Sequence, residues 1–243
     1  MVGRREQLRT SLLQSIRDAA LAELRRTGPA ELSLREVAKV AGISPSGLYR
    51  YVEGRDGLLE LLVSDGFERF GKSVAEAIAV AGPVFADQVV ALAESYQSWA
   101  TANPEQFSLI LGSPVVGFNP DPDGPTGVAV RQFGTPMLQV ILDAAASGQL
   151  NALPSPLAPI DLDPAVPSIP AGLIEIAMRS WARIHGMVIL EAFGHLNWTG
   201  QDVEAVLRSE AESIAATFGR ASSPRGATNR RARGTGAPVS NAS

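Results

Sequence analysis

The stretch that decides the fold is residues 33–58, SLREVAKVAGISPSGLYRYVEGRDGL. A serine followed three residues later by a glutamate forms a capping box, so Ser33 is expected to begin a helix, with the glutamate returning to the serine amide. Ser44 begins a second helix, because serine caps the first free amides and Pro45 tolerates the first helical position. A glycine turn at residues 41–43 separates the two. Two short capped helices joined in this way predict a helix-turn-helix.

The second helix of such a motif lies in the major groove of DNA, so its outer face is the candidate DNA-binding surface. Small residues there permit close backbone approach, hydroxyls reach phosphates, and arginines near helix starts favour phosphate contact. The side chains that share these properties are Ser33, Arg35, Ser44, Ser46, Gly47, Tyr49, Tyr51 and Arg55. We expect Arg50 to face away from DNA as a surface cation.

Two of these assignments have alternatives that the sequence leaves open. Tyr49 is either a phosphate-facing hydroxyl or a half-buried packing residue. Arg35 reads a base, anchors a phosphate or is only a solvated charge, and its loss would relax sequence preference only in the first case. For the whole segment, the alternative is an ordinary helical hairpin within a bundle.

Composition excludes several other classes of function. The chain has 243 residues, 45% hydrophobic and 19% charged, which is a normal globular balance. It has no cysteine, so thiolate metal sites and cysteine nucleophiles are absent, and its two histidines, His185 and His195, form no cluster. No nucleophile elbow, phosphate loop or dinucleotide fingerprint occurs. We therefore expect a non-enzymatic protein without metal or cofactor, and, since no signal peptide or membrane span is evident, a cytoplasmic one.

Charge is distributed unevenly along the chain. Residues 1–57 carry ten Lys and Arg against seven Asp and Glu, whereas residues 71–219 carry five against fifteen. A basic head on an acidic body indicates that a polyanion would meet the head. Residues 219–243 contain five arginines and no acid, and their composition predicts a disordered tail, either solvated or weakly attracting DNA.

Apolar residues at helical spacing predict an all-α protein with two domains. We expect an N-terminal three-helix DNA-binding domain at 1–57, a helical bundle at 58–219, which the family resemblance given below implies is a ligand-binding and dimerisation domain, and the tail from 220. The expected helices outside the central motif are 5–26, 58–70, 84–102, 105–111, 127–148, 171–196 and 201–218. Eleven of the seventeen prolines lie between residues 113 and 172, which predicts long irregular connections there.

The C-terminal half contains candidates for a ligand pocket and for a dimer interface. Large side chains from separate helices are Tyr96, Trp99, Phe107, Met137, Met178, Trp181 and His185. They would line a site for a small, mostly apolar effector, with plain core packing as the alternative. The two last helices carry more apolar surface than one core face requires, so we expect a homodimer through them, with Val206 at the interface.

Residues 28–62 resemble the DNA-binding domain of the TetR family, with homology extending over about residues 10–70. The matching pieces are Leu34-Arg35-Glu36-Val37-Ala38, Ala41-Gly42-Ile43-Ser44, Gly47-Leu48-Tyr49-Arg50-Tyr51-Val52 and Arg55-Asp56-Gly57-Leu58-Leu59. Trp181, His185 and Gly186 also resemble the Trp-His-Gly signature of one C-terminal subclass. The resemblance implies a ligand-responsive repressor that binds palindromic double-stranded DNA as a homodimer and does not enter membranes. The alternatives are an activator, or a helical adaptor of the same architecture that binds no DNA.

Overall fold

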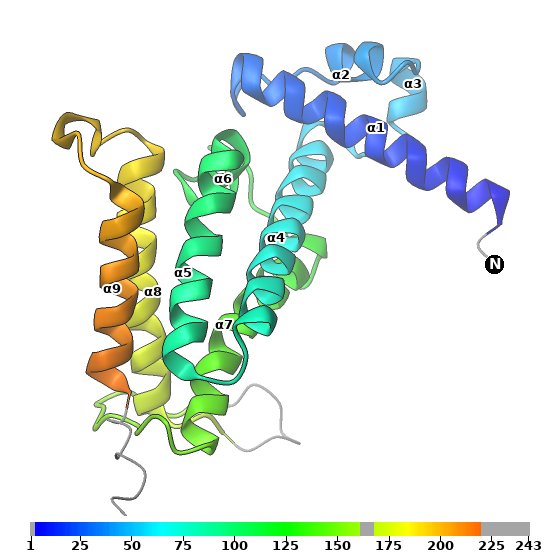
Figure 1. Ribbon diagram of the computed structural model, residues 1–243. Helices are drawn as coiled ribbons and strands as arrows, with labels where there is room; N and C mark the ends of the chain where they lie inside the picture. Colours follow the sequence, from blue (N-terminus) through cyan, green and yellow to red (C-terminus); the bar gives the residue numbers. More distant parts are fainter. Residues whose placement is uncertain (1–2, 161–167, 220–243) are drawn as a thin grey trace, which may run out of the picture.

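The computed structural model describes residues 3–160 and 168–219, and these ranges are helical apart from loops and two isolated β-bridges (Figure 1). The predicted all-α class is therefore confirmed. The elements are α1 (Arg4–Thr27), α2 (Leu34–Val40), α3 (Pro45–Leu48), α4 (Gly54–Ala81), α5 (Phe85–Ala102), α6 (Pro104–Leu111), α7 (Pro125–Ala146), α8 (Ala171–Ala192), the 3-10 helix η1 (Asn197–Thr199) and α9 (Val203–Phe218). The predicted arginine-rich tail lies outside the described residues.

Side-chain caps begin α2, α3 and α9. Several helix bounds differ from the sequence prediction, and the largest difference is at α4, which was expected at 58–70 and runs from Gly54 to Ala81. The Asp202 side chain accepts the amide of Ala205, so α9 begins at Val203 rather than at 201. Helix α8 ends at Ala192 instead of running to 196, because Gly194 takes a positive φ of 73° that leaves the helical path. Helix α7 passes through Pro136 without ending.

The buried side chains form two hydrophobic cores that share α4. The first core lies among α1, α2, α3 and the start of α4, and it contains Ile16, Val37, Leu48, Leu58 and Leu62 at 5% exposure or less. The second core lies among the later turns of α4 and helices α5 to α9. Figure 1 shows α4 running from the group α1–α3 into the bundle. A displacement of α4 therefore alters the side-chain packing of both cores.

Polar contacts fix the first core against the bundle. The buried carboxylate of Asp65 on α4 lies 3.4 Å from Arg17 on α1 and 3.3 Å from the amide nitrogen of Gln106 on α6. Arg25 on α1 pairs with Glu105 on α6 at 3.3 Å. These contacts tie α1, α4 and α6 together at the junction of the two cores.

The connection between α6 and α7 makes a second bridge. Its side chain Val115 packs on the first core, and Phe118 packs on both cores. The start of α7 is tied to α4 by a buried hydrogen bond between Thr126 and Ser64, 3.3 Å long. Among the described residues, no helix has the length and apolar character needed to cross a membrane.

Candidate nucleic-acid interface and effector pocket

The turn after α2 and the start of α3 form as their sequence predicts. The hydroxyl of Ser44 accepts the amide of Gly47 at 3.1 Å, and Pro45 occupies the first helical position. Helix α3 spans four residues, and hydrogen-bonded turns continue it to Val52, whose amide bonds the carbonyl of Leu48. Leu48 is fully buried and anchors this segment to the first core. Its opposite face is therefore presented to solvent.

The predicted DNA-contacting residues divide by exposure. Arg35, Ser44, Ser46 and Tyr49 are exposed, with Tyr49 at 58%, so its packing alternative is disfavoured. Ser33, Gly47, Tyr51 and Arg55 are half-buried. Ser44 and Ser46 also bond each other through their hydroxyls at 3.1 Å. The exposed group forms the outer surface of the motif, and the half-buried group supports it.

Two of the half-buried residues have structural partners. Arg55 donates from Nη2 to the carbonyl oxygen of Pro29 at 2.7 Å, and it thereby holds the α1–α2 connection against the start of α4. Tyr51 packs against the first core. Arg50, expected to face away, is exposed near Leu8 and Leu12 of α1.

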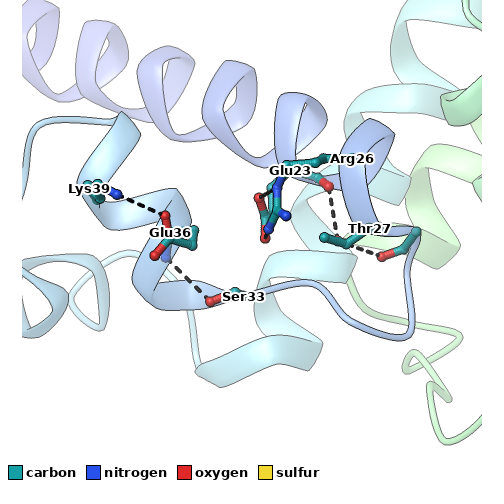
Figure 2. Close-up of polar contacts among 7 residues, drawn as sticks. Glu23, Arg26, Thr27, Ser33, Glu36 and Lys39 are labelled. Atoms are coloured by element: carbon teal, nitrogen blue, oxygen red, sulfur yellow. Dashed lines mark hydrogen bonds and ion pairs between the residues drawn. The ribbon is translucent and has the colours of Figure 1, made fainter.

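The capping box at α2 forms only in one direction. The Ser33 hydroxyl accepts the amide of Glu36 at 3.4 Å, but the Glu36 carboxylate pairs with Lys39 at 3.3 Å (Figure 2). The backbone amide of Ser33 instead bonds the carboxylate of Glu23 on α1. The hydrogen bond from Arg26 lowers the pKa of Glu23, and the backbone amide of Ser33 lowers it further. The start of α2 is therefore fixed by α1 as well as by its own sequence.

An apolar pocket of about 360 Å³ opens between α4, α5, α7 and α8. It is lined by Phe67, Val89, Leu92, Leu111, Val130, Phe133, Gly134, Met137, Leu138, Val140, Ile141, Ala177, Met178, Ser180, Trp181 and Ile184. Met178 and Trp181 on α8 and Val130 on α7 are 42–58% exposed, so the pocket reaches the surface between these two helices.

Three of the seven residues expected for effector binding line this pocket: Met137, Met178 and Trp181. Trp99 and Phe107 do not, because they pack in the second core around Phe70, which stacks on Trp99 with ring centroids 4.3 Å apart. Tyr96 and His185 are also outside the lining. The sequence prediction missed the residues of α7 other than Met137 that line the pocket. Their helical spacing is visible in the sequence, but spacing does not show which helix faces a cavity.

Tyr96 and His185 instead contact Trp181 and fix its position. The indole Nε1 of Trp181 donates to the Tyr96 hydroxyl at 3.4 Å, and that hydroxyl lies 2.9 Å from Nδ1 of His185. The indole stacks on the imidazole with centroids 5.0 Å apart. Burial raises the pKa of Tyr96 and lowers the pKa of His185, so both are neutral at pH 7. The imidazole tautomer decides whether the phenol or Nδ1 is the donor in this hydrogen bond.

A second, polar cleft of about 790 Å³ lies between α5 and the connection from α8 to α9. Its carboxylates Glu94 and Glu191 have partners, an ion pair with Arg208 and a 2.7 Å hydrogen bond from Gln97. Across residues 3–160 and 168–219, no group of three or more His, Cys, Asp and Glu is arranged to hold a metal.

The outer face of α8 and α9 carries apolar side chains that the subunit does not bury. Leu190 and Val206 are 42% and 48% exposed, and Phe193, just after α8, is 43% exposed. Trp198 in η1 is 85% exposed.

These features define the class: a helix-turn-helix DNA-binding regulator whose motif is joined by one long helix to a separate helical domain. The family profile for bacterial regulatory proteins of the tetR family matches residues 16–62, and the profile for the tetracyclin repressor-like C-terminal domain matches residues 89–214. The chain belongs to the TetR family of transcriptional regulators.

Known proteins resemble the chain over most of its length. The HTH-type transcriptional regulator Rv1816 of Mycobacterium tuberculosis is 32% identical over 202 residues, which cover 79% of this chain and 86% of that protein. A protein of unknown function from Rhodococcus sp. RHA1 has a similar structure, with TM-score 0.69, 23% identity and coverage of 86% and 96%. The regulator FadR of Bacillus subtilis, solved with stearoyl-CoA, has TM-score 0.61, 14% identity and coverage of 84% and 98%. These two solved structures share the fold of this chain.

Proposed function

We propose that this protein is a cytoplasmic, ligand-responsive repressor that binds a palindromic operator as a homodimer and acts by binding rather than by catalysis, without a cofactor. The observation that carries the proposal is α4, which contributes to both the core of the DNA-binding motif and the wall of the apolar pocket. Leu58 and Leu62 belong to the first core, and Phe67 lines the pocket. The DNA-binding unit is then residues 1–57, with the first turns of α4 completing its core.

The exposed surface around α3 supplies the DNA contacts in this proposal. Tyr49 and Ser46 present hydroxyls that suit phosphates, and Arg35 on α2 is exposed as well. The half-buried residues Ser33, Gly47, Tyr51 and Arg55 set the position of this surface through the caps and packing described above. Ser44 lies on the surface and also caps α3. In this proposal, N–H groups of these residues that make no hydrogen bond within the described part of the protein donate to DNA phosphates.

Dimerisation is assigned to the face of α8 and α9. Val206 and Leu190 are large apolar side chains left exposed by the subunit, as expected of an interface covered in a symmetric dimer. Two copies packed through α8 and α9 would form a four-helix arrangement and place two recognition helices on one face of DNA. Binding to successive major grooves requires a spacing of about 34–36 Å between them.

The effector site is assigned to the apolar pocket. A ligand that contacts Phe67 of α4 and Phe133 of α7 acts on two segments that pack against the first core, namely α4 itself and the connection that precedes α7. Such a ligand releases DNA only if it binds the DNA-incompetent arrangement more tightly, because equal affinity for both states shifts nothing. The solved complex of FadR with stearoyl-CoA supports small-molecule response in this fold.

Operator selection followed by mobility shift tests the DNA role. Tyr49→Phe is expected to weaken binding to matched and mismatched operators alike, because a phosphate contact positions without specifying. Arg35→Ala is expected to relax preference at one base pair of each half-site by about 1–3 kcal/mol, if its partner is a guanine. Lys72→Ala, at an exposed cation of α4 that pairs with Glu76 of the same helix, is the control and should leave binding to both operators unchanged. Failure of the wild-type chain to select any duplex would refute the proposal, and a promoter reporter separates repression from activation.

A further inference from the structure

Ser180 is an unusual polar side chain for its position in α8. It is 9% exposed, it lines the apolar pocket, and its hydroxyl has no hydrogen-bond partner within the described part of the protein. A hydroxyl inside a helix normally bonds the carbonyl four residues earlier, as Thr135 and Thr217 do here at 2.8 and 2.7 Å. Because a buried hydroxyl without a partner is costly, the partner of Ser180 is to be sought in the pocket.

The rest of the pocket offers no competing polar side chain among the described residues. Its lining side chains are hydrocarbon, aromatic or thioether groups, and the indole N–H of Trp181 is already donated to Tyr96. The charged residues of the same helix are turned to other partners, with Arg179 paired to Glu175 and Arg183 to Glu210. An ionised ligand group placed here would lose its hydration and gain no counter-charge.

The volume sets the size of a compatible molecule. At the roughly 30 Å³ that a water molecule occupies in the liquid, the cavity of about 360 Å³ holds on the order of a dozen non-hydrogen atoms. Gly134 on α7 forms part of the wall, and a Cβ placed on it would meet no atom within 4 Å. A larger side chain at this position therefore extends into the free space of the pocket.

We propose that the effector is an uncharged molecule of about this size, with an apolar body and one hydrogen-bonding group that binds the Ser180 hydroxyl. This inference rests on the proposed role of the pocket as the effector site, and it narrows the ligand class. It excludes ligands that would place a carboxylate, an amine or a phosphate in the buried part of the pocket at Ser180. Ser180 is then the residue that selects for the polar group, and the apolar wall supplies most of the affinity.

The test uses three probes of equal chain length: 1-octanol, octanoate at pH 7.5 and octane. Binding is measured with the full chain by calorimetry and by tryptophan fluorescence, to which Trp99, Trp181 and Trp198 all contribute. The wild-type protein is expected to bind 1-octanol at least about tenfold more tightly than octanoate, because the carboxylate would be buried without a partner. Ser180→Ala is expected to weaken 1-octanol by roughly threefold to tenfold, the value of one hydrogen bond, and to leave octane unchanged.

Two further variants keep the result interpretable. Gly134→Leu is expected to abolish binding of 1-octanol and octane by filling the cavity, and its circular dichroism reports whether the fold is retained. Ser98→Ala, at an exposed serine of α5 outside the pocket, is the matched control and should bind all probes as the wild type does.

Several outcomes would overturn the inference: octanoate binding as tightly as 1-octanol, an unchanged 1-octanol affinity in Ser180→Ala, or no binding of any probe. The proposed function is judged separately by mobility shift. If 1-octanol binds with the expected pattern but operator DNA stays bound, the ligand class stands and effector control through this pocket falls. If operator binding itself is absent, the repressor proposal falls whatever the probes do.

Discussion

Replacing Gly134 by alanine should stabilise the protein. Gly134 lies in the interior of α7, where glycine has a helix propensity about 0.8–1.0 kcal/mol less favourable than alanine. The new Cβ would meet no atom within 4 Å, so no steric cost offsets this gain. We therefore expect the free energy of unfolding to rise by about 1 kcal/mol. For a chain of this size that corresponds to an increase in Tm of about 2–4 °C.

A matched substitution at Gly71 should bring no gain in stability. Gly71 lies in the interior of α4, so alanine brings the same gain in propensity. Its Cβ, however, would stand 3.1 Å from Cα of Phe133, which is backbone of α7. Separating two packed helices costs about 1–3 kcal/mol, which equals or exceeds the gain. The two variants should therefore differ by about 1–3 kcal/mol, with Gly71→Ala the less stable.

Urea unfolding followed by circular dichroism measures both variants against the wild type. The midpoint should move up for Gly134→Ala and stay level or move down for Gly71→Ala, with similar slopes if the extent of unfolding is unchanged. A lower midpoint for Gly134→Ala, or equal midpoints for the two variants, would refute the reasoning that α7 is open at Gly134 and in close contact with α4 at Gly71.

Three further predictions concern assembly, pH and the junction of the two cores. Val206→Glu should give a folded monomer by sedimentation velocity, because it places a charge on the exposed apolar face; an unchanged dimer would move the interface elsewhere. Burial lowers the pKa of His185 below 6.5. The free energy that the neutral, buried His185 contributes to stability is therefore complete above pH 6.5 and is lost as the pH falls through the folded-state pKa. H185Q should show a smaller drop in Tm than the wild type between about pH 7.5 and 5.0, and equal drops would contradict this. Asp65→Asn should cost about 1–2 kcal/mol in urea, because Arg17 is part-buried and loses its counter-charge; no change would show that the pair is not stabilising.

Interactions within a few residues of one another could be predicted from the amino-acid sequence alone. The caps at Ser33 and Ser44, the proline after Ser44 and the intervening glycine turn act over three or four residues, so residue type and spacing suffice to predict the motif. The same holds for the all-helical class, because apolar spacing is a property of one segment. The predicted helix bounds were wrong where the sequence allows two end points. At the end of α8, Gly194 rather than the last apolar residue terminates the helix.

Contacts between distant segments were decided only by the tertiary structure. Tyr96, Trp99 and Met137 all occur at helical spacing, yet Trp99 stacks in the core, Tyr96 supports Trp181, and Met137 lines the pocket. Ser180 gives no signal in the sequence, because a serine in a helix ordinarily bonds its own backbone. Its missing partner and its place opposite α7 depend on how α4, α5, α7 and α8 pack, and that packing is set by the summed burial of side chains from all four helices rather than by any one segment.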